Sequence, residues 1–343
     1  MKRIVVAAAL LLAACGDGTS SEPVTLTLIA HESFTPSEDI FDAFTAATGV
    51  AVAVVNAGDA GEIVTKAALT SGNPEGDVLW GVDNTLLSRA LESKMFEPYE
   101  AAGLAAIPEE LRNGIPNFEV TPVDSGDVCI NYDIAWYAER GIKPPTTLDD
   151  LIDEQYRGQL VVQSPLTSSP GLAFMLASIA SFGESQWLDY WDALRRNDVL
   201  VVEGWTEAYY SEFSGSGGGT RPLVVSYASS PPAEVLFADP PRDDAPTAVA
   251  VDTCFRQVEY AGVLRGTPYP DEARLLIDYL IGETFQADLP LTQFVYPVNS
   301  AVALPEVFTR FAIRPTTPLT MRPERIAENR VAWLDAWTAT VLK

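Results

Sequence analysis

Basic residues are scarce in this chain of 343 residues. Lys and Arg together number 22 against 47 Asp and Glu, and histidine occurs once, which gives a formal net charge of −25. Proteins that bind nucleic acid need a basic surface to neutralise phosphates, so this balance argues against a nucleic-acid partner. The excess of acid either attracts a cationic ligand or keeps a secreted protein soluble, and solubility is the simpler explanation.

Common catalytic patterns and long apolar runs are also absent. The sequence contains no Ser-His-Asp pattern, metalloprotease motif or phosphate-binding glycine loop. An apolar run at residues 4–14 is too short to cross a bilayer core of about 30 Å as a helix, and no other segment is long and apolar enough. The sequence therefore indicates neither a common hydrolase nor a membrane-spanning protein.

The short apolar run has the features of an export signal. Lys2 and Arg3 precede it, and it ends in LAAC at residues 12–15, which is similar to a bacterial lipobox. We expect a lipoprotein signal peptide at residues 1–14, then a lipidated Cys15 and a flexible tether through residue 23. The alternative is an ordinary signal peptide with a chance cysteine. The first interpretation places the protein outside the cytoplasm, anchored to the bacterial cell membrane through lipid alone.

Two further cysteines, Cys129 and Cys254, remain in the mature chain. An even pair in an exported protein suggests a disulfide, and two free thiols are the alternative. The bond would close a loop of about 125 residues, which stabilises the fold by about 4–5 kcal/mol in the chain-entropy model.

Strand and helix patterns alternate along the chain, which predicts an α/β fold with a largely parallel sheet. The length is sufficient for two domains with separate cores. The expected strands are residues 24–30, 50–55, 77–82, 128–132, 160–163, 199–202 and 223–226. The expected helices are residues 37–48, 63–69, a helix capped by Ser169, 270–281 and 323–341.

Loops that follow the expected strands carry rings, hydroxyls and carboxylates that are unusual in a core. They include HESF at 31–34, NAGDAG at 56–61, SPLTSSPG at 164–171, EGW at 203–205 and YASSP at 227–231. Because ligands of open α/β sheets bind outside the carboxyl ends of the strands, we expect a cleft lined by these loops.

Six segments resemble the thiamine-binding proteins of bacterial ABC importers, in that family's order and over nearly the whole mature chain. They are ESF at 32–34, DVLWGVDNTLL at 77–87, SPLTSSPGL at 164–172, EGWTEAY at 203–209, VSYASSP at 225–231 and VYPVNS at 295–300. The resemblance implies a type II periplasmic-binding-protein fold, in which two α/β lobes, each with a mixed, mostly parallel sheet flanked by helices, are joined by a hinge. Lobe 1 would comprise residues 24–126 and 255–343, and lobe 2 residues 127–254.

The resemblance also implies a non-enzymatic receptor that holds thiamine, or thiamine monophosphate, between the lobes and delivers it to an ABC permease. Trp205 and Tyr227 match the family's ligand-contacting rings, and Asp59 and Ser168 match its polar contacts. No cofactor is implied, and a monomer is expected.

Four positions depart from the family's pattern. His31 stands where relatives have tyrosine, and Phe294 where they have tryptophan. Ala233 replaces an expected stacking tyrosine, and Ala60 an expected glycine. The changes at His31 and Phe294 exchange one ring for another, whereas Ala233 removes a ring. We also expect the loop at Asp59 to follow a shifted path, with flexibility supplied by Gly61.

Thiamine carries a cationic thiazolium, a flat aminopyrimidine and a hydroxyethyl arm. A cation over an aromatic face gains about 0.5–2 kcal/mol, and a carboxylate can balance its charge. The candidate carboxylates are Asp59, Glu32 and Asp83. Ser168 and Ser169 lie at an expected helix N-terminus, which favours a hydroxyl or a phosphate. Few bases lie near these loops, so a strong preference for the diphosphate is not expected.

Several of these residues also have purely structural interpretations. His31 could be a hydrogen-bonding residue without a ligand, and Asp83 could cap the next helix. Ser169 could act only as a helix cap. Of the adjacent Tyr209 and Tyr210, we expect one to pack inward and the other to border the cleft.

Two other functions remain open from the sequence. Some iron-binding members of this fold use paired tyrosines, so Tyr209 and Tyr210 raise the possibility of a ferric-ion receptor. Thiaminase I shares the fold and uses a cysteine nucleophile with a glutamate base, which would require a free Cys129 or Cys254. A disulfide between these cysteines would exclude the enzyme.

Overall fold

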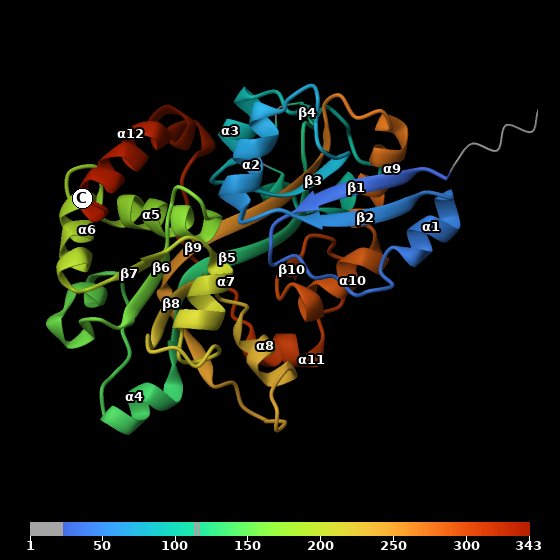
Figure 1. Cartoon of the computed structure of the whole chain (residues 1–343). Coiled ribbons are helices and arrows are strands. Elements are labelled where there is room, and N and C mark those ends of the chain that lie inside the picture. Colours follow the sequence, from blue (N-terminus) through green and yellow to red (C-terminus); the bar gives the residue numbers. More distant parts are fainter. Residues whose placement is uncertain (1–22, 113–114, 116) are drawn as a thin grey trace, which may run out of the picture.

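The computed structural model describes residues 23–112, 115 and 117–343 (Figure 1). The expected signal peptide and Cys15 lie outside the described residues. Within them, we find no helix with the length and apolar character that crossing a membrane requires.

The described residues form a ten-stranded mixed sheet whose central order is β2-β1-β3-β9-β5-β8-β6-β7. Parallel pairs lie at both ends of the sheet, and β9 and β5 join them through antiparallel pairs. Its strands are β1 Thr25–Ala30, β2 Ala51–Asn56, β3 Val78–Asp83, β4 Phe96–Glu97, β5 Thr121–Asp133, β6 Leu160–Gln163, β7 Leu200–Val202, β8 Leu223–Tyr227, β9 Thr247–Leu264 and β10 Tyr296–Pro297.

Helices pack against this sheet, with α2 and α3 above β3 and α10 below it in Figure 1. The helices are α1 Asp42–Thr48, α2 Ala60–Leu69, α3 Leu87–Glu92, α4 Ile134–Arg140, α5 Ser169–Phe182, α6 Trp187–Arg196, α7 Trp205–Glu207, α8 Pro231–Leu236, α9 Pro270–Leu280, α10 Glu283–Thr292, α11 Glu306–Phe311 and α12 Pro323–Val341. The α/β fold class expected from the sequence is confirmed.

Strands β5 and β9 are the main departure from the expected elements. We expected only residues 128–132 of β5 and nothing of β9, yet these strands have 13 and 18 residues. Their antiparallel register runs from Thr121 opposite Ala261 to Asp133 opposite Thr247. Because β9 also pairs with β3 and β5 also pairs with β8, the two strands connect the two halves of the molecule.

Most other expected elements form within a few residues of their expected bounds, and β6 and α12 have the expected bounds. Helix α1 is shorter than expected, because the backbone N–H and the hydroxyl of Ser37 donate to Asp288 and hold the preceding residues outside the helix. Helix α5 begins at Ser169, so its N-cap residue is Ser168 and not Ser169 as expected.

Helix α12 contacts both α6 and α3. Its buried side chains are Ile326, Trp333 and Trp337, and the indole of Trp337 makes an edge contact with Trp191 of α6. The C-terminal helix therefore lies against elements of both proposed lobes, and the residue bounds of the lobes remain a prediction.

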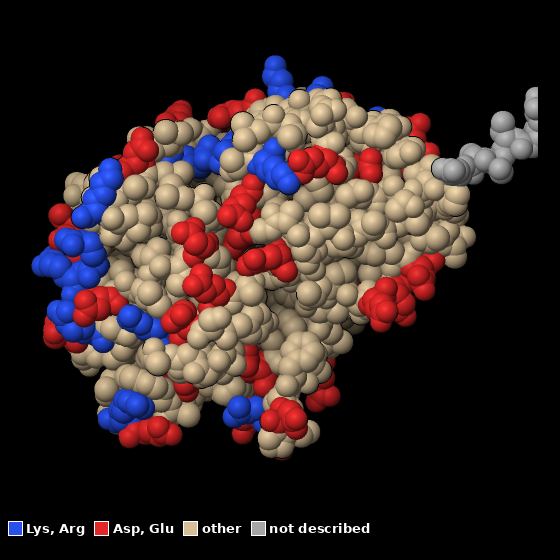
Figure 2. Space-filling model, viewed as in Figure 1, with Lys and Arg blue, Asp and Glu red and all other residues tan. Residues whose placement is uncertain are grey.

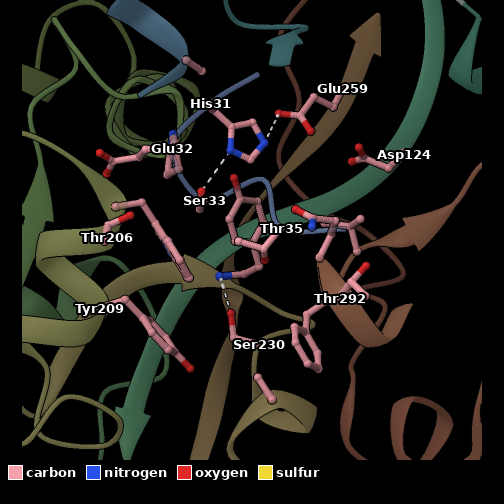
Figure 3. A pocket seen from close by; sticks show the side chains of 18 of the residues that line it. His31, Glu32, Ser33, Thr35, Asp124, Thr206, Tyr209, Ser230, Glu259 and Thr292 are labelled. Carbon is pink, nitrogen blue, oxygen red and sulfur yellow. Dashed lines mark hydrogen bonds and ion pairs between the residues drawn. The ribbon is translucent and has the colours of Figure 1, made fainter. Parts of the chain in front are cut away.

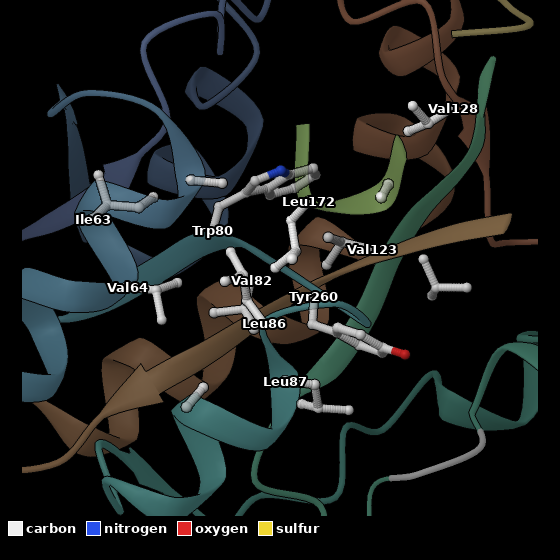
Figure 4. Packing of buried hydrophobic residues seen from close by; sticks show 14 of the residues in the cluster. Ile63, Val64, Trp80, Val82, Leu86, Leu87, Val123, Val128, Leu172 and Tyr260 are labelled. Carbon is white, nitrogen blue, oxygen red and sulfur yellow. The ribbon is translucent and has the colours of Figure 1, made fainter. Parts of the chain in front are cut away.

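The core beside β3 is packed around a buried tryptophan, Trp80 (Figure 4). Its ring lies 5.1 Å from Phe34 and 5.4 Å from Phe285, between centroids. The indole N–H donates to a carboxylate oxygen of Glu259 at 3.0 Å. This bond connects the apolar core to the polar cavity described below.

Cys129 and Cys254 form a disulfide between β5 and β9, as expected from the sequence. Both residues are buried. The bond lies where the register of the two strands shifts, between Val128 and Ile130.

We expect removal of the disulfide in a Cys129→Ala/Cys254→Ala variant to lower the free energy of unfolding by about 3–5 kcal/mol, because its loop spans 125 residues. Urea unfolding with and without reductant measures this difference. The double variant should not respond to reductant. A loss below about 1 kcal/mol would show that β-sheet pairing alone fixes this junction.

Candidate functional site

A cavity of about 500 Å³ lies between the two halves of the molecule, within the size range of small-molecule sites. Loops after β1, β2, β6, β7 and β8 contribute to its walls, as the strand-end rule predicts. Strands β5 and β9 and the segment after α10 complete them. Figure 3 shows that side chains from these separate elements converge on one space.

Most of the site residues expected from the sequence border this cavity. They are His31, Glu32, Asp59, Ala60, Ser169, Trp205, Tyr209, Tyr227 and Phe294. Asp83 and Ser168 are fully buried and are not among the lining residues. Asp83 accepts from the backbone N–H and hydroxyl of Thr85 and from the N–H of Leu86, so it caps the turn before α3.

An aromatic wall is built around Trp205. Tyr209 stacks on the indole with centroids 4.9 Å apart and an interplanar angle of 15°. The indole N–H donates to Ser226, whose hydroxyl is 2.9 Å from that of Ser230, and Ser230 in turn accepts from the N–H of Tyr227. Ser226 thus holds the indole of Trp205, and Ser230 holds the backbone of Tyr227. Trp205 is only partly buried and lines the cavity, so the aromatic surface is available to a ligand.

The adjacent tyrosines divide as expected, since Tyr209 is buried and Tyr210 is exposed. Burial raises the pKa of Tyr209 well above its ordinary value, and it also raises the pKa of Tyr210. Ferric sites need phenolate oxygens, which these environments disfavour. Among the described residues, no group of three or more His, Cys, Asp or Glu side chains could hold a metal ion.

The cavity lining contains an aromatic ring that the sequence interpretation missed. Phe237 lies four residues further along, at the end of α8, and lines the cavity together with Ala233. Its ring makes an edge contact with Phe294, with centroids 5.6 Å apart. A ring therefore borders the cavity one helical turn beyond Ala233, which the spacing from Ala233 to Phe237 could have indicated.

The floor of the cavity contains Glu259, which the sequence interpretation also missed. This carboxylate accepts from Trp80 and lies 3.7 Å from the Nε2 atom of His31. Burial alone would raise the pKa of Glu259, but the His31 imidazole lowers it below its ordinary value. Burial would likewise lower the pKa of His31, and Glu259 raises it. The two groups therefore stabilise each other's charged forms.

Asp124 and Gln257 lie beside Glu259, one on β5 and one on β9. Asp124 is 3% exposed, and Gln257 is also 3% exposed. One oxygen of each, Oδ2 of Asp124 and Oε1 of Gln257, has no hydrogen-bond partner in the described part of the chain. Both side chains line the cavity, so these buried acceptors are placed to meet a donor or a cation.

Asp59 connects the two halves of the molecule at the cavity wall. Its Oδ1 atom accepts from Ala60 and, at 3.4 Å, from the N–H of Ser169, and its Oδ2 atom accepts from the N–H of Trp205 at 3.0 Å. Burial raises the pKa of Asp59, and these bonds oppose that effect. Both oxygens already have backbone donors, including two from loops on the far side of the cavity.

Gly61 permits close contact at the same junction, because it has no side chain. A Cβ atom at this position would lie 2.3 Å from the carbonyl oxygen of Thr167, in the loop before α5. Gly61 lies within the first turn of α2, which starts at Ala60. The expected flexible path at Gly61 is therefore wrong, because the glycine is helical and its role is to permit close approach.

The surface above the cavity is acidic. Figure 2 shows Asp and Glu side chains gathered over the middle of this face, while most Lys and Arg side chains lie toward its periphery. Glu32 and Asp59 lie on the cavity wall, and Asp124 and Glu259 lie at its floor. Among the described residues that line the cavity, none is Lys or Arg.

A sheet crossed by two long connecting strands, with a cavity between its halves, defines a protein that captures a small solute. The profile of the family described as bacterial extracellular solute-binding protein matches residues 73–310. The chain belongs to this family of binding proteins.

The curated relatives and solved structures agree with this assignment. The chain is 28% identical to the thiamine-binding periplasmic protein of Salmonella typhimurium, over 96% of this chain and 97% of the relative. It is 25% identical to the protein of the same name from Brucella suis, over 92% and 91%. A solved periplasmic thiamin binding protein superimposes with a TM-score of 0.81 at 27% identity, over 92% of this chain and 96% of the other.

The resemblance stated from six short segments is confirmed by these matches. An iron-bound protein from Pseudomonas aeruginosa also superimposes, with a TM-score of 0.73 at 19% identity over 92% of this chain and 99% of the other, which shows the shared fold alone. The chain is a binding receptor and not an enzyme, in agreement with the disulfide that occupies both Cys129 and Cys254.

We predict that Gly61→Ala weakens ligand binding at least about tenfold while the protein stays folded. Alanine is more favourable than glycine in a helix by up to about 1 kcal/mol, so the substitution should stabilise α2 itself. The new methyl group, however, would push α2 away from the carbonyl oxygen of Thr167. Calorimetric titration and thermal unfolding measure the two effects. Leu69→Ala, at an exposed position on the same helix, is the control. Unchanged affinity in Gly61→Ala would show that this contact does not matter for binding.

Proposed function

We propose that the protein captures thiamine outside the cytoplasm and delivers it to an ABC permease. The single observation that carries this proposal is the cavity itself, in which an aromatic wall faces four carboxylates without any lining Lys or Arg among the described residues. A flat organic cation suits such a surface, because aromatic faces and carboxylates both attract positive charge. The names of the relatives and of the superimposed structure support the same ligand.

The arrangement favours thiamine over its phosphates. A phosphate would be expected at the N-terminus of α5, where backbone N–H groups attract anions. The N–H of Ser169 instead faces the Asp59 carboxylate, which would repel a phosphate at that position. We therefore propose that the hydroxyethyl arm, and not a phosphate, lies near Ser169, and that Trp205 and Tyr227 bind the rings.

The remaining features of the proposal concern the cell. A lipidated Cys15 would tether the receptor to the outer surface of the cell membrane through residues 16–23. We further propose that it acts as a monomer whose two lobes close on thiamine by a hinge motion before docking on the permease. Globomycin treatment, which blocks lipoprotein signal cleavage, should leave an unprocessed precursor in membranes if the anchor is correct.

We expect Trp205→Ala to weaken thiamine binding by about tenfold or more, because a stacked cation contact contributes about 1–2 kcal/mol. Isothermal titration of the mature domain with thiamine measures the loss. Trp136→Ala removes an indole from α4, away from the cavity, and should leave the affinity unchanged. Equal affinity for wild type and Trp205→Ala would show that the aromatic wall does not contribute to ligand binding.

Asp59→Asn tests whether this residue joins the lobes or balances the ligand's charge. Both carboxylate oxygens accept backbone N–H groups, so the NH₂ of asparagine would face either Trp205 or Ala60 and leave that donor without an acceptor, at a cost of about 1–3 kcal/mol. We expect thiamine and neutral hydroxymethylpyrimidine to lose affinity by the same factor, about tenfold to a hundredfold. A loss confined to thiamine would instead identify Asp59 as the counter-charge.

A further inference from the structure

Three carboxylates lie side by side across the centre of the sheet. Asp83 on β3 is paired with Glu259 on β9, and Glu259 is paired with Asp124 on β5. Residues directly opposite on neighbouring strands share one face of a sheet, so the three acids form a row. All three are buried, at 0%, 9% and 3% exposure in that order. Like charges directly opposite one another destabilise a sheet, so the row needs protons or a cation.

The groups that face this row come from every element around it. His31 and Glu32 follow β1, Asp59 precedes α2, Tyr227 ends β8 and Tyr260 follows Glu259 on β9. Of these groups only His31 can carry a positive charge, and its Nε2 atom lies 3.7 Å from a carboxylate oxygen of Glu259. Asp83 is held by Gln257, whose side-chain N–H₂ donates to it at 2.7 Å. Asp124 therefore has no basic partner among the described residues that line the cavity.

The chemistry of the three acids differs accordingly. Burial raises the pKa of Asp124 well above its usual range, and so do the charge of Glu259 and a hydrogen bond in which the protonated Asp124 donates to Glu259. Burial raises the pKa of Asp83 to about 7. The pKa of Glu259, by contrast, is lowered by His31. Of the three acids, Glu259 therefore ionises most readily, and Asp124 and Asp83 hold their protons to higher pH than ordinary carboxylic acids do.

We propose that this row is the counter-charge for the cationic ring of the ligand, and that Asp124 releases a proton to solvent when the cation binds. The unpartnered Oδ2 atom of Asp124 borders the cavity, where Figure 3 shows the side chain beside Glu259. When the cation arrives, the carboxyl O–H bond breaks, the proton passes to a buffer base, and the carboxylate remains beside the cation. This inference rests on the proposed function, which supplies the cationic ligand.

The sign of the pH dependence follows from proton linkage. A ligand whose binding releases protons binds more tightly as pH rises, until the acid is already ionised in the free protein. Release of one full proton gives a tenfold gain in affinity per pH unit by this linkage, and partial release gives less. We therefore expect the affinity for thiamine to rise with pH, by at most about tenfold per unit, until Asp124 is ionised in the free protein.

The test is calorimetric titration of the mature protein at pH 7 in phosphate and in Tris, whose ionisation enthalpies differ widely. Thiamine should give different heats in the two buffers, from which at least about half a proton released per site is calculated. Neutral hydroxymethylpyrimidine should bind with no release. In Asp124→Asn the release should fall to less than half of the wild-type value, and any remainder would come from Asp83, while Asp252→Asn, at an exposed position on β9, should behave as wild type.

Each outcome distinguishes the inference from the function on which it rests. No heat with thiamine in either buffer would overturn the receptor proposal. Thiamine binding with equal heats in both buffers would leave the receptor intact and overturn proton exchange. Equal proton release with neutral hydroxymethylpyrimidine would show that the positive charge of thiamine does not cause the release. Release that stays above half of the wild-type value in Asp124→Asn would assign the proton to another group, such as His31, and would also count against the proposal.

Discussion

Burial of carboxylates in the middle of the sheet is the constraint that shapes the cavity. Asp83, Glu259 and Asp124 are held in register by two strand pairings, so they cannot separate without breaking the connection between the two halves. Burying a charge without a partner is costly, and the fold offsets that cost with the indole of Trp80 and the imidazole of His31. The polar floor is thus a direct consequence of how β3, β9 and β5 pair.

The same strands explain why the floor and the wall can act together. Glu259 belongs to the junction, whereas Trp205 follows β7 and Tyr227 ends β8, both in the other half. Asp59 brings these parts into contact, because its carboxylate accepts N–H groups from the loops at Ser169 and Trp205. The Asp59 carboxylate therefore faces backbone N–H groups, and the negative charge available to a ligand is that of the acids at the cavity floor. Two acids in one cavity have different functions because their hydrogen-bond donors differ.

Much of the fold and part of the site could be predicted from the sequence. The loop at Trp205 was recognisable because a glycine and a cluster of rings follow a short apolar strand, and β6 and α12 follow clear patterns. Strand β5 could not be recognised in the same way. Its residues TPVDSGDV combine Pro122, Gly126 and acids, which have low strand propensity, and only pairing with strands on both sides makes them a strand.

The missed strands explain the missed site residues. Asp124 and Glu259 look like ordinary surface acids in a sequence, because their burial depends on pairings between segments more than 100 residues apart. Phe237 was missed for a different reason, since its helix moves a ring by one turn relative to Ala233. Local motifs thus locate the part of the site that lies on loops, while the part built by long-range pairing requires the structure.

Selectivity in this cavity follows from its lining, which contains no Lys or Arg among the described residues. A neutral planar molecule can stack on Trp205, but it gains nothing from the charge on Glu259. An anion would have to displace Asp59 from the N-terminus of α5, and it would lie in a buried space where repulsion is weakly screened. A planar cation satisfies both surfaces at once. In the proposed complex the wall would select for shape and the floor for charge, and neither alone would distinguish the cation from other flat rings.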